Sequence, residues 1–423
     1  MKYEVVIIAG SCYPISSATG GIALKCADYL KETCNIRIIA LQEENHAENG
    51  TLYRNASIYT LTNWRYKWAQ MSKLKWQAAK GRKKTLYSCS NYMARAIGRI
   101  QSALFYVDNS WWYKRKSVRL LEKMNKQKPI DVILSFCAPI EAHAAAMEFK
   151  SKHSNICWIS YWADLFATKQ NCRNLFISLI KMKQMEDDML EASNHVFVTD
   201  EVYQVFADRA KQEIHNKMEA LPYIFNQNIL ERDNYVAVVE TEPIRCVYMG
   251  SFYRDIRNPE YMLELFCKLK QLCVLDLYTT GNCGDIVERI SKKSNGRIIE
   301  HGLVPKEALD EVLRNAHVLI NIENTVSTSN PSKLFELMSY RKPIIDFSHN
   351  EDPSEVIKKY PTSINVDMEK ACQDESLKVD EFLSEIRKFK PIDYKIIEKK
   401  FARNFEHSYR EKVTGAIADQ CKN

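Results

Sequence analysis

Short apolar runs rich in β-branched residues alternate with helical patterns along most of this chain. Such alternation is typical of parallel α/β sheets, in which a helix follows each strand and packs on a face of the sheet. In the first half, the runs predict strands at residues 4–9, 36–41, 131–136, 156–161 and 195–199. The patterns between them predict helices at residues 21–32, 140–152, 174–191 and 201–211.

The alternation breaks over residues 222–243, where an acidic stretch lies between two prolines, and then restarts. The second half predicts strands at residues 245–249, 274–278, 297–301, 318–321 and 343–347, with helices at 259–272, 305–315 and 331–340. We therefore predict two doubly wound, Rossmann-like α/β domains, 1–222 and 245–392, joined by a linker at 223–244 and followed by a helical segment at 393–423. Because ligands of such sheets bind beyond the carboxyl ends of the strands, we expect the site in the cleft between the domains.

The composition fits a globular protein of this kind, with 46% hydrophobic and 27% charged residues in 423. An acidic residue, Glu4, precedes the first apolar run, which favours a strand over a signal peptide. No apolar run approaches the roughly 18 residues that span a bilayer. The 13 cysteines form no C-x-x-C pair, which argues against zinc and for a reducing compartment. We expect a cytoplasmic protein, either soluble or peripheral on the inner face of a membrane.

One region, an insertion at about 60–128, departs from the α/β pattern. Between Trp64 and Lys128 there are 17 Lys and Arg residues against two acids, and five of the seven tryptophans. Cations beside tryptophans suit an anionic membrane surface, where indoles lie at the polar–apolar boundary. Two alternatives remain open: a solvated basic helix with a few core aromatics, and a nucleic-acid surface. The membrane interpretation is the one we favour, and we do not expect nucleic acid as a partner.

The segment after the strand at 318–321 combines groups that suit a phosphorylated ligand. A polar loop at 323–330 leads to a helix that we expect to begin at Pro331. The start of a helix favours an anion, and Ser332 and Lys333 add a hydroxyl and a cation. Glu336, one turn later, could accept hydrogen bonds from the hydroxyls of a ribose. The alternative is an ordinary amphipathic helix with Lys333 and Glu336 in solvent.

Residues 330–345, NPSKLFELMSYRKPII, resemble the donor-site segment of GT-B glycosyltransferases similar to family 4, often written PSK-x-FEY-x-A-x-GKPI. The resemblance implies that Lys333 contacts the diphosphate of a nucleotide-sugar and that Glu336 holds its ribose. The segment also departs from the family pattern. Arg341 replaces a glycine in the turn after the helix, and Thr328 stands where the family has an acid near the donor sugar.

Further segments extend the resemblance over nearly the whole chain except the basic insertion. Gly20 and Gly21 resemble the glycine turn beneath the acceptor and phosphate, and Gly250 the turn that opens the donor domain. The family places basic residues after that second turn, where Arg254 is our preferred candidate and Arg257 the other. Gly302 matches the turn whose backbone meets the base.

In the first domain the resemblance singles out Asp164, just after the strand at 156–161, as the residue that would orient or deprotonate an acceptor hydroxyl. Asp164 could equally cap the following segment. His143 holds another family position, but a histidine among alanines on a helix is more often an ordinary core or surface residue. There is no D-x-D, so we expect no metal or other cofactor, with Lys, Arg and the helix start in its place.

These features predict a glycosyltransferase that moves a hexose from a nucleotide-diphosphate donor to a saccharide or lipid-linked acceptor in surface or capsular polysaccharide synthesis. The resemblance implies that the configuration at the anomeric carbon is retained. Two alternatives share the fold: a nucleotide-sugar 2-epimerase, and a non-catalytic protein that binds a glycan or a partner. The sugar, the base and the linkage are open.

Overall fold

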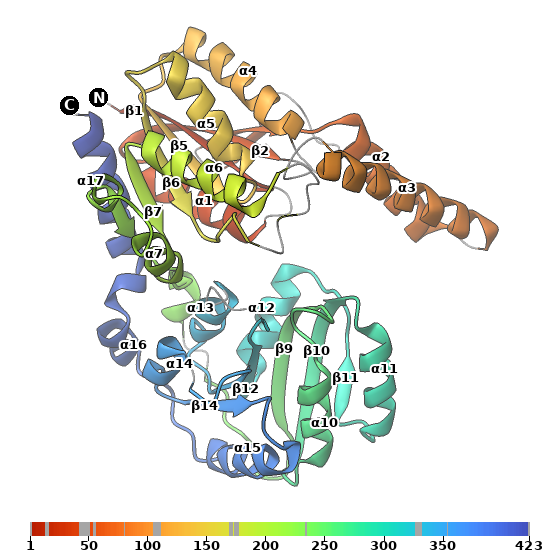
Figure 1. Cartoon of the computed structure of the whole chain (residues 1–423). Helices are drawn as coiled ribbons and strands as arrows, with labels where there is room; N and C mark the ends of the chain where they lie inside the picture. The colour runs from red at the N-terminus through yellow and green to blue at the C-terminus, as the bar shows by residue number, and fades with distance from the viewer. Residues whose placement is uncertain are drawn as a thin grey trace. The chain divides into compact units, whose positions relative to one another are not determined.

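The computed structural model describes residues 2–12, 17–41, 51–53, 56–79, 81–104, 111–168, 172, 177–232, 235–325, 332–352 and 354–421. The chain divides into two compact units (Figure 1). Unit 1 comprises residues 1–222 and 409–423, and unit 2 comprises residues 223–408.

Unit 1 contains a sheet in the order β3-β4-β2-β1-β5-β6-β7-β8, in which every pairing is parallel except β3 with β4. Its strands are β1 (Tyr3–Ala9), β2 (Cys34–Leu41), β3 (Thr51–Tyr53), β4 (Ala56–Leu61), β5 (Val132–Cys137), β6 (Cys157–Trp162), β7 (His195–Val198) and β8 (Met218–Ala220). Its helices are α1 (Ala18–Leu30), α2 (Trp64–Ala78), α3 (Arg82–Leu104), α4 (Trp111–Gln127), α5 (Glu141–Lys152), α6 (Leu179–Ala192), α7 (Asp200–Ala207), α8 (Gln212–His215) and most of α17 (Glu406–Cys421).

The core of unit 1 lies on both faces of this sheet. All residues of β5 and β6 are buried, which explains why these strands read as continuous apolar runs and do not alternate. Ile133 and Trp158 pack with Ala145 and Phe149 of α5 and with Val118 of α4. On the other side, α1 contacts β1, β2 and β5.

Unit 2 contains an all-parallel sheet in the order β11-β10-β9-β12-β13-β14. Its strands are β9 (Ile244–Phe252), β10 (Cys273–Gly281), β11 (Ile298–Glu300), β12 (Val318–Ile322), β13 (Ile344–Ser348) and β14 (Ser363–Asp367). Its helices are α9 (Gln227–Leu230), α10 (Glu260–Lys268), α11 (Gly284–Lys293), α12 (Lys306–Asn315), α13 (Ser332–Met338), α14 (Glu355–Lys359), α15 (Cys372–Ile386), α16 (Tyr394–Lys400) and the 3-10 turn η1 (Ala402–Asn404).

Each sheet has a point where its strand order changes direction. In unit 1 the first strand, β1, lies between β2 and β5, and in unit 2 the first strand, β9, lies between β10 and β12. The loops that leave the carboxyl ends of such neighbouring strands diverge, and ligands of open α/β sheets bind where they do. The loops after β1 and β5, and those after β9 and β12, are therefore the places to examine.

The structure confirms the ten predicted strands with shifts of a few residues at their ends, and adds β3, β4, β8 and β14. The predicted linker contains α9 and belongs to unit 2. The predicted C-terminal segment is shared between the units, because α16 and η1 belong to unit 2 whereas residues 409–423 belong to unit 1. Tyr409 packs edge-on against Tyr29 of α1, with ring centroids 5.7 Å apart.

The described residues of the basic insertion form three helices with two different environments. α4 belongs to the core, because Trp112 and Tyr113 are buried and the Tyr113 hydroxyl donates to the carbonyl oxygen of Ala9 at 2.7 Å. Trp112 and Tyr113 are therefore core residues and do not face a membrane, while the membrane interpretation of the rest of the region stays a prediction. By contrast, α2 and α3 lie side by side and pack mainly on each other (Figure 1).

Candidate functional site

Helix α13 follows β12 and carries three of the predicted donor-site residues. Leu334, Phe335, Leu337 and Met338 are buried in the core of unit 2, which fixes the orientation of the helix. The remaining face presents Ser332, Lys333 and Glu336, all half-buried. The described helix starts at Ser332, whereas Thr328 and Pro331 lie outside the described residues.

Lys333 and Gly250 meet at the point where the sheet of unit 2 changes direction. A Cβ atom on Gly250 would lie 2.5 Å from Lys333 Nζ and 3.1 Å from Tyr248 Oη, so the ammonium group lies directly over the glycine. Gly250 also has a φ of +144°, which side chains rarely tolerate. Two residues 83 positions apart in the sequence are thus brought into contact by β9 and α13.

Arg257 is the second cation at this point. Its Nη2 donates to the side-chain oxygen of Asn324, just after β12, at 2.8 Å. Burial and the neighbouring Arg257 together lower the pKa of Lys333 to about 8, although Glu336 acts in the opposite direction. Burial raises the pKa of Tyr248 to about 12 even though Arg257 opposes it. Lys333, Arg257 and Tyr248 therefore form one electrostatic cluster.

Arg254, which the sequence analysis preferred as the basic residue of the donor site, does not lie beside Lys333. It is exposed and forms an ion pair with Asp285 in the first turn of α11. The loop after β9 explains the difference. Tyr253 and Arg257 exchange two backbone hydrogen bonds, at 3.2 and 2.7 Å. The chain therefore reverses direction and brings Arg257 back to the carboxyl end of β9. The structure thus places Arg257, and not Arg254, beside Lys333.

Gly302 follows β11, two strands away from β9 in the sheet order. Its φ of +69° is in the left-handed region, and no atom lies within 4 Å of the position of its Cβ. Just before it, His301 stacks on Tyr278 with centroids 4.6 Å apart and its Nε2 lies 2.7 Å from Asp276 Oδ1. Two strand spacings correspond to about 10 Å between Gly302 and the Lys333 cluster.

A buried acid pair beside this cluster was missed by the sequence analysis. Glu323 follows β12 and Asp346 lies in β13, where it accepts from Asn321 Nδ2 at 2.6 Å. Burial raises the pKa of both carboxyl groups, and the proximity of Glu323 raises that of Asp346 further. The sequence feature that could have revealed this pair is Asp346 itself, an acid inside the apolar run that begins at Pro343.

In unit 1 the predicted glycine turn lies at the other change of strand order. A Cβ on Gly20 would lie 1.9 Å from the carbonyl oxygen of Ser11, so only glycine fits. Ser17 caps α1 by accepting from the Gly20 amide, and Thr19 Oγ1 donates to the Ala138 carbonyl at 3.0 Å. Gly21 continues the first turn of α1. The loops after β1 and β5 are thus packed against each other.

Asp164 lies two residues beyond β6 and is exposed. His143 is fully buried in α5, with its Nδ1 2.7 Å from Ser135 Oγ and its ring 4.3 Å from that of Trp162. Burial lowers the pKa of His143 to about 3. Of the two ordinary roles that the sequence analysis favoured, core or surface, the structure shows the first.

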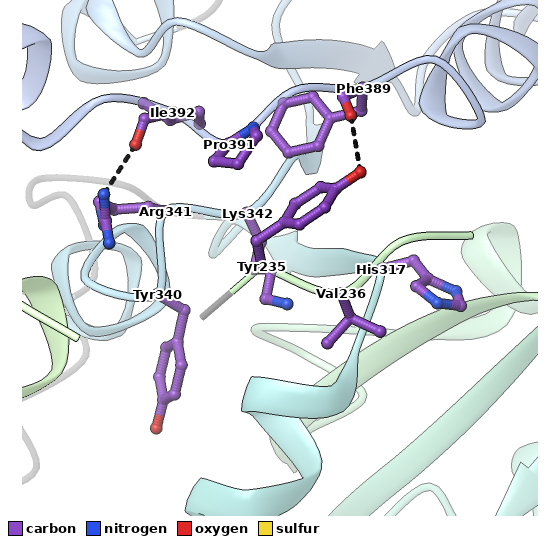
Figure 2. A pocket seen from close by; sticks show the side chains of 9 residues that line it. All are labelled: Tyr235, Val236, His317, Tyr340, Arg341, Lys342, Phe389, Pro391 and Ile392. Carbon is purple, nitrogen blue, oxygen red and sulfur yellow. Dashed lines mark hydrogen bonds between the residues drawn. The ribbon is translucent and has the colours of Figure 1, made fainter. Parts of the chain in front are cut away.

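A small pocket lies near the amino ends of strands β12 and β13 of the unit 2 sheet, at the end opposite to Lys333 (Figure 2). Its lining includes His317, which precedes β12, and Lys342, which precedes β13. Tyr235 Oη donates to the Phe389 carbonyl at 3.2 Å and Arg341 Nη1 to the Ile392 carbonyl at 3.0 Å, as Figure 2 shows. Its volume of about 10 Å³ suits a single water, and no predicted site residue lines it.

No family model matches the chain, and no curated protein matches it. Several solved structures match over nearly its whole length. Sucrose-phosphate synthase from Thermosynechococcus elongatus matches with a TM-score of 0.69 at 12% identity, covering 99% of both chains. The apo form of the lipopolysaccharide outer core galactosyltransferase WaaB matches with a TM-score of 0.59 at 10% identity, covering 98% of this chain and 99% of the other.

HepE of Anabaena, in complex with UDP and glucose, matches with a TM-score of 0.59 at 7% identity, covering 99% of this chain and all of the other. These likenesses cover both units. The chain therefore has the GT-B fold, with two Rossmann-like α/β units.

Proposed function

We propose that this protein transfers a hexose from a nucleotide-diphosphate donor to the hydroxyl of a saccharide or lipid-linked acceptor, with retention of configuration at the anomeric carbon. The observation that carries the proposal is the contact of Lys333 with Gly250 next to Arg257. Burial lowers the pKa of Lys333, and repulsion by the neighbouring Arg257 lowers it further, so two cations are held side by side and partly out of water. A diphosphate between them would relieve that repulsion.

The same groups would assist the chemistry. When the bond between the sugar and the diphosphate breaks, negative charge builds up on the departing oxygen. Asn324 holds the Arg257 guanidinium, and α13 places Lys333 next to Gly250, before the reaction begins. Groups fixed in advance stabilise such charge without having to reorganise. We propose that these cations take the role that a divalent metal has in other nucleotide-sugar enzymes.

The rest of the donor has assignable positions. Glu336, one turn after Lys333, is proposed to accept hydrogen bonds from the ribose hydroxyls, and Ser332 to contact the diphosphate. Gly302 would present its backbone to the base, since two strand spacings of about 10 Å suit the distance between a diphosphate and its base. The resemblance of residues 330–345 to the donor segment of GT-B enzymes supports these roles.

We assign the acceptor to unit 1, where Asp164 would orient or deprotonate its hydroxyl and Gly20 and Gly21 would allow close backbone approach. A role in surface or capsular polysaccharide synthesis is proposed on the combination of this fold with the basic insertion. It is in keeping with the likeness to a lipopolysaccharide outer core galactosyltransferase.

The test is the release of nucleoside diphosphate from a panel of UDP- and GDP-linked sugars. Thermal shifts with UDP-, GDP- and CMP-linked sugars detect binding. We expect one donor to raise the melting temperature and to release its nucleotide faster when acceptor is added. A shifted melting temperature without any release would indicate a binding protein. Formation of an epimeric nucleotide-sugar without acceptor would indicate a 2-epimerase.

A further inference from the structure

The helices α2 and α3 form an antiparallel pair. Trp68 Nε1 donates to Ser90 Oγ at 2.9 Å, and Ser72 Oγ lies 2.8 Å from the same oxygen. Further along α2, Lys75 Nζ lies 5.8 Å from the ring centroid of Tyr87, which comes earlier on α3. The pair packs mainly on itself and appears as the two adjacent helices labelled α2 and α3 in Figure 1.

Each of these helices carries an exposed apolar stripe. Trp64 and Met71 are seven residues apart on α2, as are Leu86, Met93 and Ile100 on α3. Seven residues make about two helical turns, so each set lies along one line. All five side chains are between 49% and 64% exposed, which is unusual for such large apolar groups.

The two stripes face the same side of the pair. Ser72 and Ser90 mark the interface between the helices. We view each helix along its axis from its own N-terminus. In that view Met71 lies about 100° from Ser72 around α2, and Met93 lies about 60° from Ser90 around α3 in the same direction of rotation. Two antiparallel helices are related by a twofold axis normal to their common plane, so rotations in the same sense lead to the same side. The five residues therefore form one apolar face.

This face lies on a strongly cationic segment. Between Trp64 and Leu104 the sequence has ten Lys and Arg residues and no acid. Lys75, Arg82 and Lys83, close to the turn between the helices, are exposed. An exposed apolar face with cations around it is suited to the interface of an anionic bilayer, where acyl chains and headgroups meet.

We propose that the apolar face of α2 and α3 docks on an anionic lipid bilayer, with its five apolar side chains in the interfacial layer and Lys75, Arg82 and Lys83 at the headgroups. A second copy of the chain would set ten cations against ten others, which disfavours self-association. Four of the five apolar side chains belong to leucine, isoleucine or methionine, which cannot stack on bases as the ring of Trp64 could, and this disfavours nucleic acid. Among the described helices, none is long and apolar enough to cross a membrane.

The test is flotation of the full chain with vesicles of phosphatidylcholine alone or mixed with phosphatidylglycerol. We expect flotation only with the anionic vesicles. In the triple variant Leu86→Ser, Met93→Ser, Ile100→Ser the partition coefficient should fall by at least about tenfold. The matched control is Tyr92→Ser, because Tyr92 is also exposed but lies about 100° around α3 from Met93. The control should float like the wild type.

Two outcomes overturn the proposal: wild-type protein that does not float with anionic vesicles, or a triple variant that floats as well as the control. Binding to a single-stranded oligonucleotide by a protein that does not float would assign the surface to nucleic acid. The inference is independent of the donor site. The triple variant should therefore keep the thermal shift with the donor nucleotide, whereas failure of the proposed function would remove that shift from the wild type as well.

Discussion

The position of Lys333 over Gly250 makes the charge of this single residue decisive for the proposed donor site. Burial and Arg257 lower its pKa to about 8 from an ordinary value of 10.5. The folded protein therefore releases this proton more readily than the unfolded chain. By linkage, the charged lysine costs stability below about pH 8, and that cost disappears as the pH rises from about 8 to about 10.5.

The first prediction is a pH dependence of nucleotide binding. As the pH rises above about 8, Lys333 loses its proton in the protein without bound nucleotide, and the affinity for nucleoside diphosphate should fall. Isothermal titration calorimetry across this range measures the effect. In Lys333→Met the affinity should be weaker throughout and should not show this fall. An equal fall in wild type and variant would mean that another group titrates.

The second prediction separates the two arginines. Arg257→Ala should weaken nucleoside diphosphate binding by about tenfold or more, because Arg257 lies beside Lys333. Arg254→Ala should change the affinity by less than about twofold, because Arg254 is occupied by Asp285 at the surface. Calorimetric titration of both variants measures the difference. The reverse ranking would contradict the site described here.

At the scale of elements, the site depends on how β9 and α13 approach each other. Any residue other than glycine at position 250 would place its Cβ against Lys333 Nζ. Its backbone would also have to adopt an unfavourable φ of +144°. The lysine tip can move aside, but it then leaves its place beside Arg257. Glycine at position 250 is thus favoured by the position of Lys333 Nζ as well as by the backbone conformation.

The third prediction follows from this contact. Gly250→Ala should lower stability by about 1–3 kcal/mol through backbone strain and should also weaken nucleotide binding. Gly284→Ala in α11 is the control, since no atom lies within 4 Å of its Cβ position and alanine suits a helix. Thermal unfolding and calorimetry measure both effects. Wild-type binding in Gly250→Ala would argue that the Lys333–Gly250 contact plays no part in binding.

For the whole molecule, much of the architecture could be predicted because buried parallel strands leave continuous apolar runs in the sequence. The edge strands β3, β8 and β14 are short or less apolar, and the sequence analysis missed them. Lys333 and Glu336 could be proposed because the helix keeps them in a fixed register. Arg257 could not be separated from Arg254, because the choice depends on a turn held by two backbone hydrogen bonds. Asp346 was hidden because its neighbours, Ile345 and Phe347, read as a core strand.

The central claim is that Lys333 and Glu336 belong to the donor site of a sugar transfer. The most direct measurement is nucleoside diphosphate release from the cognate donor with saturating acceptor, in wild type, Lys333→Ala and Glu336→Ala. Lys292→Ala and Glu288→Ala are matched controls, since they form an exposed ion pair of 2.7 Å one turn apart on α11. We predict that each site variant loses at least roughly tenfold in rate, about 1.4 kcal/mol of transition-state stabilisation, while the controls keep wild-type rates. Wild-type rates in both site variants would contradict the account.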